Sequence, residues 1–81
     1  MQTIKGNIRT TIYMSENGFF VETFKVKEAS EDLKELLNKV ITVTGLIIDP
    51  NEEDTYILTG TYQKHERYGF QFQFNEYQKV I

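Results

Sequence analysis

The sequence predicts a mostly β domain, a small barrel of five strands with one short helix. Three observations lead to this prediction. Apolar and polar residues alternate over five short stretches, as in strands with one buried face. Only the stretch near residues 31–39 has the spacing of an amphipathic helix. Glycines lie inside the strands, as in a sheet that bends, and 81 residues provide one domain, residues 1–81.

Residues 3–14 are expected to form the first strand. Gly6 lies inside this strand and indicates a bend or a close approach of another backbone segment. Asn17-Gly18 then provides the positive φ angles of a tight hairpin turn. The side chains predicted to face the core are Ile4, Ile8, Ile12 and Met14.

Residues 19–27 are expected to return as the second strand. The apolar positions change phase inside it, because Phe19 and Val21 point one way while Phe24 and Val26 point the other. A β-bulge near residues 22–23 would reconcile the two halves, and bulges are common where small barrels turn a corner.

The next segment changes to a helical period. Ser30 is placed to cap a helix of two to three turns, and Glu31 and Asp32 suit its first turn. The side chains of its apolar stripe are Leu33, Leu36, Leu37 and Val40.

Three further strands are expected at residues 40–49, 55–61 and 70–79. Phe70, Phe72 and Phe74 alternate in the last of these and are predicted to be core residues. Five short strands, internal glycines and a bulge favour an OB-like barrel. In the usual OB arrangement the helix follows the third strand, whereas here it follows the second.

The residue inventory argues against catalysis by this chain. It contains no Walker loop, no G-x-G-x-x-G and no H-E-x-x-H motif. Cysteine is absent and His65 is the only imidazole, which excludes disulfides, thiolate metal sites and multi-histidine sites within one chain. The acidic residues 49–54 do not match the EF-hand spacing, so a solvated turn is favoured over a calcium site. We therefore expect no cofactor in this segment.

The negative charge is concentrated in the middle of the chain. Residues 28–58 carry eight acidic and two basic side chains, whereas both ends have a small basic excess within a net charge of -3. Nucleic-acid-binding domains usually have a clear basic excess, so binding to single-stranded DNA would be weak or assisted by neighbouring domains. No apolar run is long enough to span a membrane, and we expect a cytoplasmic location.

Residues 60–74 combine aromatic, basic and amide side chains on one stretch. In OB-like barrels, aromatic side chains stack on bases while cations contact phosphates. Ordinary roles are also open: Tyr62 and Tyr68 could close the barrel end, His65 could bond to loop backbone, and the cations could simply be solvated. The candidate contact residues are Lys5, Arg9, Tyr13, Tyr62, Lys64, His65, Arg67 and Tyr68.

The same stretch resembles a known helicase signature. The spacing of Gly60, Tyr62, His65, Tyr68, Gly69, Gln71 and Phe72 is similar to the "G-x-W-x-x-H-x-x-Y-G-x-Q-F" motif of RecD-like ATP-dependent DNA helicases, which include exodeoxyribonuclease V alpha-subunit-like proteins. Residues 15–21 resemble the family's "E-E-N-G-Y-x-V" hairpin, and residues 42–45 its "V-x-G" strand. This chain departs from the motif at Tyr62, where tryptophan is usual, and at Phe70, where a basic or polar residue is common.

The resemblance implies a non-catalytic OB-like domain at the N-terminus of a larger 5′–3′ DNA helicase that acts in repair or recombination. ATP and magnesium would then bind to motor domains outside this chain, and single-stranded DNA and the other helicase domains would be its partners. The resemblance adds Gln71 to the contact residues, with Gly60, Gly69 and Phe72 as structural positions. The alternative is a protein-interaction or packing module without direct nucleic-acid contact, which the acidic middle segment favours.

Overall fold

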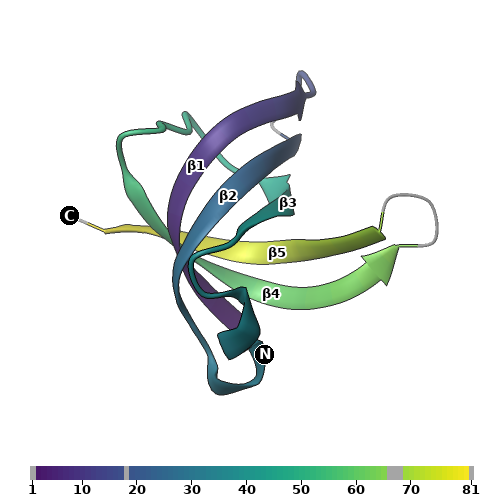
Figure 1. Cartoon of the computed structure of the whole chain (residues 1–81). Helices are drawn as coiled ribbons and strands as arrows, with labels where there is room; N and C mark the ends of the chain where they lie inside the picture. The colour runs from purple at the N-terminus through teal and green to yellow at the C-terminus, as the bar shows by residue number, and fades with distance from the viewer. Residues whose placement is uncertain (1, 18, 66–68, 81) are drawn as a thin grey trace.

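Five strands close into a barrel, and a short 3-10 helix lies at the end of the barrel near the N-terminus (Figure 1). The computed structural model describes residues 2–17, 19–65 and 69–80. The elements in chain order are β1 (Gln2–Met14), β2 (Phe19–Ala29), η1 (Glu31–Leu36), β3 (Val40–Leu46), β4 (Thr55–His65) and β5 (Gly69–Val80).

The strand order around the barrel is β1-β2-β3-β5-β4, with β4 pairing back to β1. All neighbouring strands are antiparallel except β3 and β5, which meet in parallel at Val43–Phe72 and Thr44–Gln73. The predicted OB-like barrel of five strands is therefore confirmed, with the helical segment between β2 and β3.

Alternate residues of every strand enter the core. Phe72 and Phe74 are buried as predicted, and Leu33 and Leu36 of η1 join the same cluster. The remaining core side chains are Ile4, Ile8, Phe20, Phe24, Val26, Val43, Ile47, Tyr56 and Leu58. Burial of these side chains is the main favourable contribution to folding in a domain of this size.

The second half of β1 leaves the core, which contradicts the prediction for Ile12 and Met14. Both side chains are about three-fifths exposed, at 59% and 62%. The register to β2 shifts between Ile8 and Thr10 and again between Thr11 and Tyr13, so one extra residue bulges at each shift. These bulges change the phase of alternation, and β1 pairs with β4 only as far as Asn7. The predicted close approach at Gly6 is present, since a Cβ there would collide with the Lys25 carbonyl oxygen.

The prediction of a bulge near residues 22–23 of β2 is wrong. Phe20, Glu22, Phe24 and Val26 all face inward in regular alternation. The apolar pattern changes phase because Glu22, a charged residue type, occupies one of the inward positions. The Glu22 side chain is fully buried and neither carboxylate oxygen has a hydrogen-bond partner. Burial raises the pKa of Glu22 from 4.5 to about 7, because the charged form is poorly solvated there.

The predicted helix near 31–39 is shorter and tighter than its apolar spacing indicated. Only Glu31–Leu36 form a 3-10 helix, while Leu37 and Val40 are exposed. With three residues per turn, positions three apart align, so Leu33 and Leu36 reach the core and the later positions do not. Ser30 does not cap the helix through its side chain; its hydroxyl accepts a bond from the Thr3 amide and donates to Asp32. Within the described residues, no helix has the length and apolar character needed to cross a membrane.

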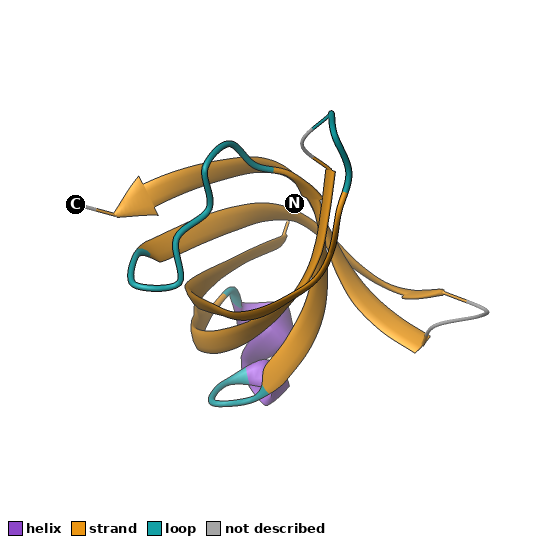
Figure 2. Cartoon of the chain, turned by 90° about the horizontal axis from the view of Figure 1, so that it is seen from above, coloured by secondary structure: helices purple, strands orange, loops and turns teal. Residues whose placement is uncertain are grey.

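The β4–β5 hairpin extends beyond the barrel as an arm, defined here as residues 62–65 and 69–71 (Figures 1 and 2). Pairing of β4 with β1 ends at Gly60, whereas β4 and β5 stay paired out to His65 and Gly69. The strand expected at residues 55–61 therefore continues to His65. Phe70 lies on this arm and is 56% exposed, so its prediction as a core residue is wrong.

Candidate nucleic-acid interface

The outer surface of the barrel carries two adjoining hollows of about 400 and 470 Å³. Val21 and Gln71 line both of them, so they form one continuous concave surface, which we call the groove face. Its residues are Ile12, Tyr13, Phe19, Val21, Thr42, Thr44, Gln63, Lys64, Gln71 and Gln73.

Strand pairing explains why these side chains meet. Because the even positions of β2 face the core, Phe19 and Val21 face outward. Val21 pairs with Thr44 of β3, and Thr44 pairs with Gln73 of β5. The parallel β3–β5 contact thus joins the first hairpin of the chain to the last one on a single surface.

The arm contributes an amide-rich part of the groove face. Gln63 and Gln71 pair across β4 and β5, and the Gln63 side-chain amide donates a hydrogen bond to the Gln73 amide oxygen at 2.5 Å. A glutamine side chain offers both donors and acceptors. These groups can therefore bond to base edges without selecting one base.

Two aromatic side chains lie exposed on the same surface. Tyr13 is 56% exposed beside the β1–β2 turn, and Phe19 follows that turn on β2. An exposed ring can stack on a nucleobase, an interaction worth about 1–3 kcal/mol per base. Tyr13 was predicted as a contact residue, whereas Phe19 was not.

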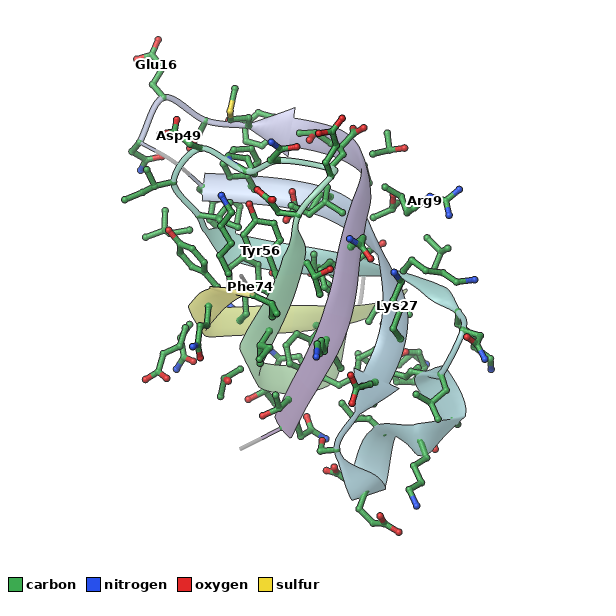
Figure 3. All side chains as sticks on the ribbon, turned by 90° about the vertical axis from the view of Figure 1, so that its left-hand side faces the viewer. Arg9, Glu16, Lys27, Asp49, Tyr56 and Phe74 are labelled. Atoms are coloured by element: carbon green, nitrogen blue, oxygen red, sulfur yellow. The ribbon has the colours of Figure 1, made fainter. Side chains whose placement is uncertain are left out.

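One basic side chain lines this surface, and others lie elsewhere on β1 and β2. Lys64 lines the hollow beside the arm. Arg9 of β1 and Lys27 of β2 are exposed but line neither hollow, and Figure 3 shows both on the same side of the barrel. Neither has an ion-pair partner within the described residues. Lys25, an outward residue of β2, donates a hydrogen bond to the Asn38 carbonyl oxygen at 2.8 Å. Of these four cations, only Lys64 lines the groove face.

The structure brings only part of the predicted cluster together. Tyr13, Lys64 and Gln71 line the groove face, whereas Arg9 does not. Lys5 is elsewhere, in an ion pair with Glu28 at 3.2 Å. The His65 side chain, Arg67 and Tyr68 lie outside the described residues.

Tyr62 lies on the other face of the arm. It precedes Gln63 in β4 and so points away from the amide surface. Its ring stacks on Phe70 with centroids 5.3 Å apart, and it packs partly against the core. Burial, together with the negative charge of Glu35, raises the pKa of the Tyr62 hydroxyl. In the described structure Tyr62 therefore supports the arm.

The three positions predicted to be structural lie at the root and tip of the arm. A Cβ at Gly60 would collide with the Gln73 carbonyl oxygen, so the two strands approach closely there. Gly69 has a φ of 81°, a left-handed conformation that favours glycine. Phe72 is fully buried.

The sequence did not predict Phe19 or six other residues of the groove face. It also did not predict the cations Lys25 and Lys27, which lie outside that face. Regular alternation in β2 would have identified Val21 as outward-facing, but the inward Glu22 hid that pattern. Thr44 and Gln73 meet only through the parallel strand contact, for which local sequence has no signal. The six residues are Ile12, Val21, Thr42, Thr44, Gln63 and Gln73.

The described residues hold no group of three or more acidic or histidine side chains that could bind a metal ion.

Comparison with known proteins gives one family. Over residues 1–81 the chain matches the family described as ATP-dependent DNA helicase YrrC, OB-fold domain. No solved structure matches the chain.

Proposed function

Because this chain belongs to the family of OB-fold domains of the ATP-dependent DNA helicase YrrC, we propose that its groove face contacts single-stranded DNA. The observation that carries the proposal is the combination of exposed rings, side-chain amides and the basic Lys64 on one concave surface. The domain would act without catalysis of its own and would assist a helicase motor in holding the strand. ATP and magnesium would bind to the motor domains, since the 81 residues contain no phosphate-binding loop.

The mode of contact follows from the residue types. Tyr13 and Phe19 would stack on bases, and Gln63 and Gln71 would hydrogen-bond to their edges. Phosphates would approach Arg9, Lys25, Lys27 and Lys64. Four such contacts predict that the logarithm of the affinity falls with the logarithm of salt concentration with a slope of about -3.

The charge of the domain makes this contact weak. The net charge is -3, and a free-standing nucleic-acid binder usually has the opposite sign. We therefore propose that neighbouring helicase domains supply most of the affinity and that this domain positions the strand for the 5′–3′ motor. DNA repair or recombination in the cytoplasm is the setting that fits this role.

The experiment is fluorescence anisotropy of a labelled oligo-dT strand titrated with the domain at low salt. Tyr13→Ala should weaken binding by about tenfold, through loss of one stacked base. Phe70→Ala is the matched control, because Tyr13 and Phe70 are equally exposed but Phe70 lines neither hollow of the groove face. Lys64→Gln should weaken binding and reduce the salt slope by about one, whereas Lys34→Gln on η1 should change neither.

Two outcomes would overturn the proposal. One is a wild-type domain that does not bind oligo-dT even at low salt. The other is equal weakening by Tyr13→Ala and Phe70→Ala, which would mean that the groove face has no particular role. The first result would favour a packing module that contacts other helicase domains and not DNA, and the second would mean that DNA binds without preference for the groove face.

A further inference from the structure

A separate hollow of about 450 Å³ lies at the end of the barrel opposite η1, between the β1–β2 turn and the segment that follows β3. We call it the acidic tip and define it by Met14, Glu16, Phe20, Ile48, Asp49 and Pro50. It shares no lining residue with the groove face.

The hollow has a buried apolar floor and an exposed apolar rim. Phe20 and Ile47 at its base are almost completely buried, whereas Ile48 on the rim is 78% exposed and Met14 is 62% exposed. The Ile48 amide donates a hydrogen bond to the Tyr77 hydroxyl at 3.1 Å, so the backbone that presents this side chain is tied to β5. Exposed aliphatic side chains held beside a hollow in this way are able to form an interaction surface.

The surroundings of the hollow are acidic. Glu16 and Asp49 belong to its lining, and Glu52 and Glu53 line a neighbouring hollow that shares Pro50 with it. No lysine or arginine lines either hollow, and none of the four carboxylates has an ion-pair partner within the described residues. Figure 3 shows Glu16 and Asp49 at one corner of the barrel and Arg9 and Lys27 on the other side. The negative charge of these four carboxylates repels phosphates, so the acidic tip does not extend the proposed DNA surface.

We propose that the acidic tip docks a protein surface that has an apolar centre and a basic rim. An apolar side chain of the partner would enter between Met14 and Ile48 and contact the floor, while lysine or arginine side chains would pair with Glu16 and Asp49. Complementary charge of this kind selects the partner and speeds the encounter. A second copy of this chain fits poorly, because two such tips would place like charges against one another.

The test uses the whole 81-residue chain and a labelled amphipathic helical peptide made of leucine and lysine as the probe. The peptide should bind, and the amide signals that shift in an NMR titration should be those of the tip. Ile48→Ser should weaken binding by about tenfold, through loss of one buried aliphatic contact. Glu16→Gln/Asp49→Asn should also weaken it and should remove most of its salt dependence.

Matched controls lie at the opposite end of the barrel. Leu37→Ser removes an exposed apolar side chain from the end of η1, and Glu31→Gln/Glu35→Gln removes two exposed charges there. Both should leave binding within about twofold of wild type. All the substituted side chains are exposed, so each variant is expected to fold.

Three results would overturn the proposal. The first is equal weakening by the tip variants and the controls, which would mean general attraction to an acidic protein. The second is equal binding of a leucine–glutamate peptide, which would rule out a basic rim on the partner. The third is a wild-type chain that sediments as a dimer and becomes a monomer on Ile48→Ser, which would identify a second copy as the occupant.

Discussion

The barrel and the arm share two strands, β4 and β5, yet the same alternation of side chains leads to burial in the barrel and to exposure in the arm. Phe72 and Phe70 lie two residues apart on one face of β5, and their exposed fractions are 0% and 56%. Phe72 lies where β3 and β5 pair, and the barrel interior covers it. Phe70 lies beyond that contact and has Tyr62 as its stacking partner. Alternation therefore determines which face a residue is on, whereas burial requires a second layer over that face.

The largest expected difference between the two regions is in packing energy. Phe72→Ala should lower the free energy of unfolding by about 3–5 kcal/mol, because it leaves a cavity in the core. Phe70→Ala removes a ring of the same size from the exposed arm and should cost less than about 1.5 kcal/mol, mainly the stacking on Tyr62. Urea unfolding of both variants measures the contrast.

Phe72→Leu provides a milder version, for use if the alanine variant does not fold. Equal losses for the Phe72 and Phe70 variants would contradict the distinction between barrel and arm.

The barrel interior also holds the carboxyl group of Glu22, whereas the described residues of the arm include no acidic side chain. The pKa of Glu22 is about 7 in the folded state against 4.5 ordinarily, so the folded state favours the protonated form. Raising the pH through this range removes stability, and the full loss is reached above pH 7. The free energy of unfolding of Glu22→Gln should therefore be about 3 kcal/mol higher than that of wild type at pH 8, and the difference should vanish near pH 4.

Thermal and urea unfolding across pH 4 to 8 measure this difference. Glu52→Gln, which removes an exposed carboxylate from the segment after β3, is the control for the loss of one negative charge. If the free energy of unfolding of Glu22→Gln differs from that of wild type by the same amount at every pH, the carboxyl group of Glu22 is not buried.

The smallest expected effect is at the tip of the arm. Gly69 has a left-handed φ of 81°, and nothing lies within 4 Å of a Cβ added there. Gly69→Ala should therefore cost only the backbone strain, about 1–2 kcal/mol, without a steric clash. Gly69→Asn should cost less, because asparagine tolerates this conformation better. If both substitutions cost as much as Phe72→Ala in the same urea assay, the arm is more tightly coupled to the barrel than its geometry indicates.

Local sequence patterns were sufficient for the strands and insufficient for their contacts. All five predicted strands are present, and two of the three phenylalanines predicted for the core, Phe72 and Phe74, are buried. The failures are at positions where a neighbouring strand changes the outcome. Ile12 is exposed because β1 bulges against β2, and Glu22 is buried because its strand continues in phase through the barrel wall.

The candidate site likewise contains residues that local sequence identified and residues that only the strand contacts bring together. Tyr13, Lys64 and Gln71 were identified from residue type or from the resemblance, and they do line one surface. Thr44 and Gln73 could not be identified, because their meeting depends on a parallel contact between strands far apart in the chain. Tyr62 was grouped with the contact residues, but its place in β4 turns it to the other face of the arm.

The sequence by itself therefore determined the five strands, the barrel class and the helicase-domain family, because alternation, turn residues and motif spacing are properties of neighbouring residues. The tertiary structure alone decided which outward side chains share the groove face and that the acidic tip lies apart from it. It also decided that Glu22 is enclosed. These results depend on strand register, bulges and the closure of the barrel, which arise from pairing between distant segments.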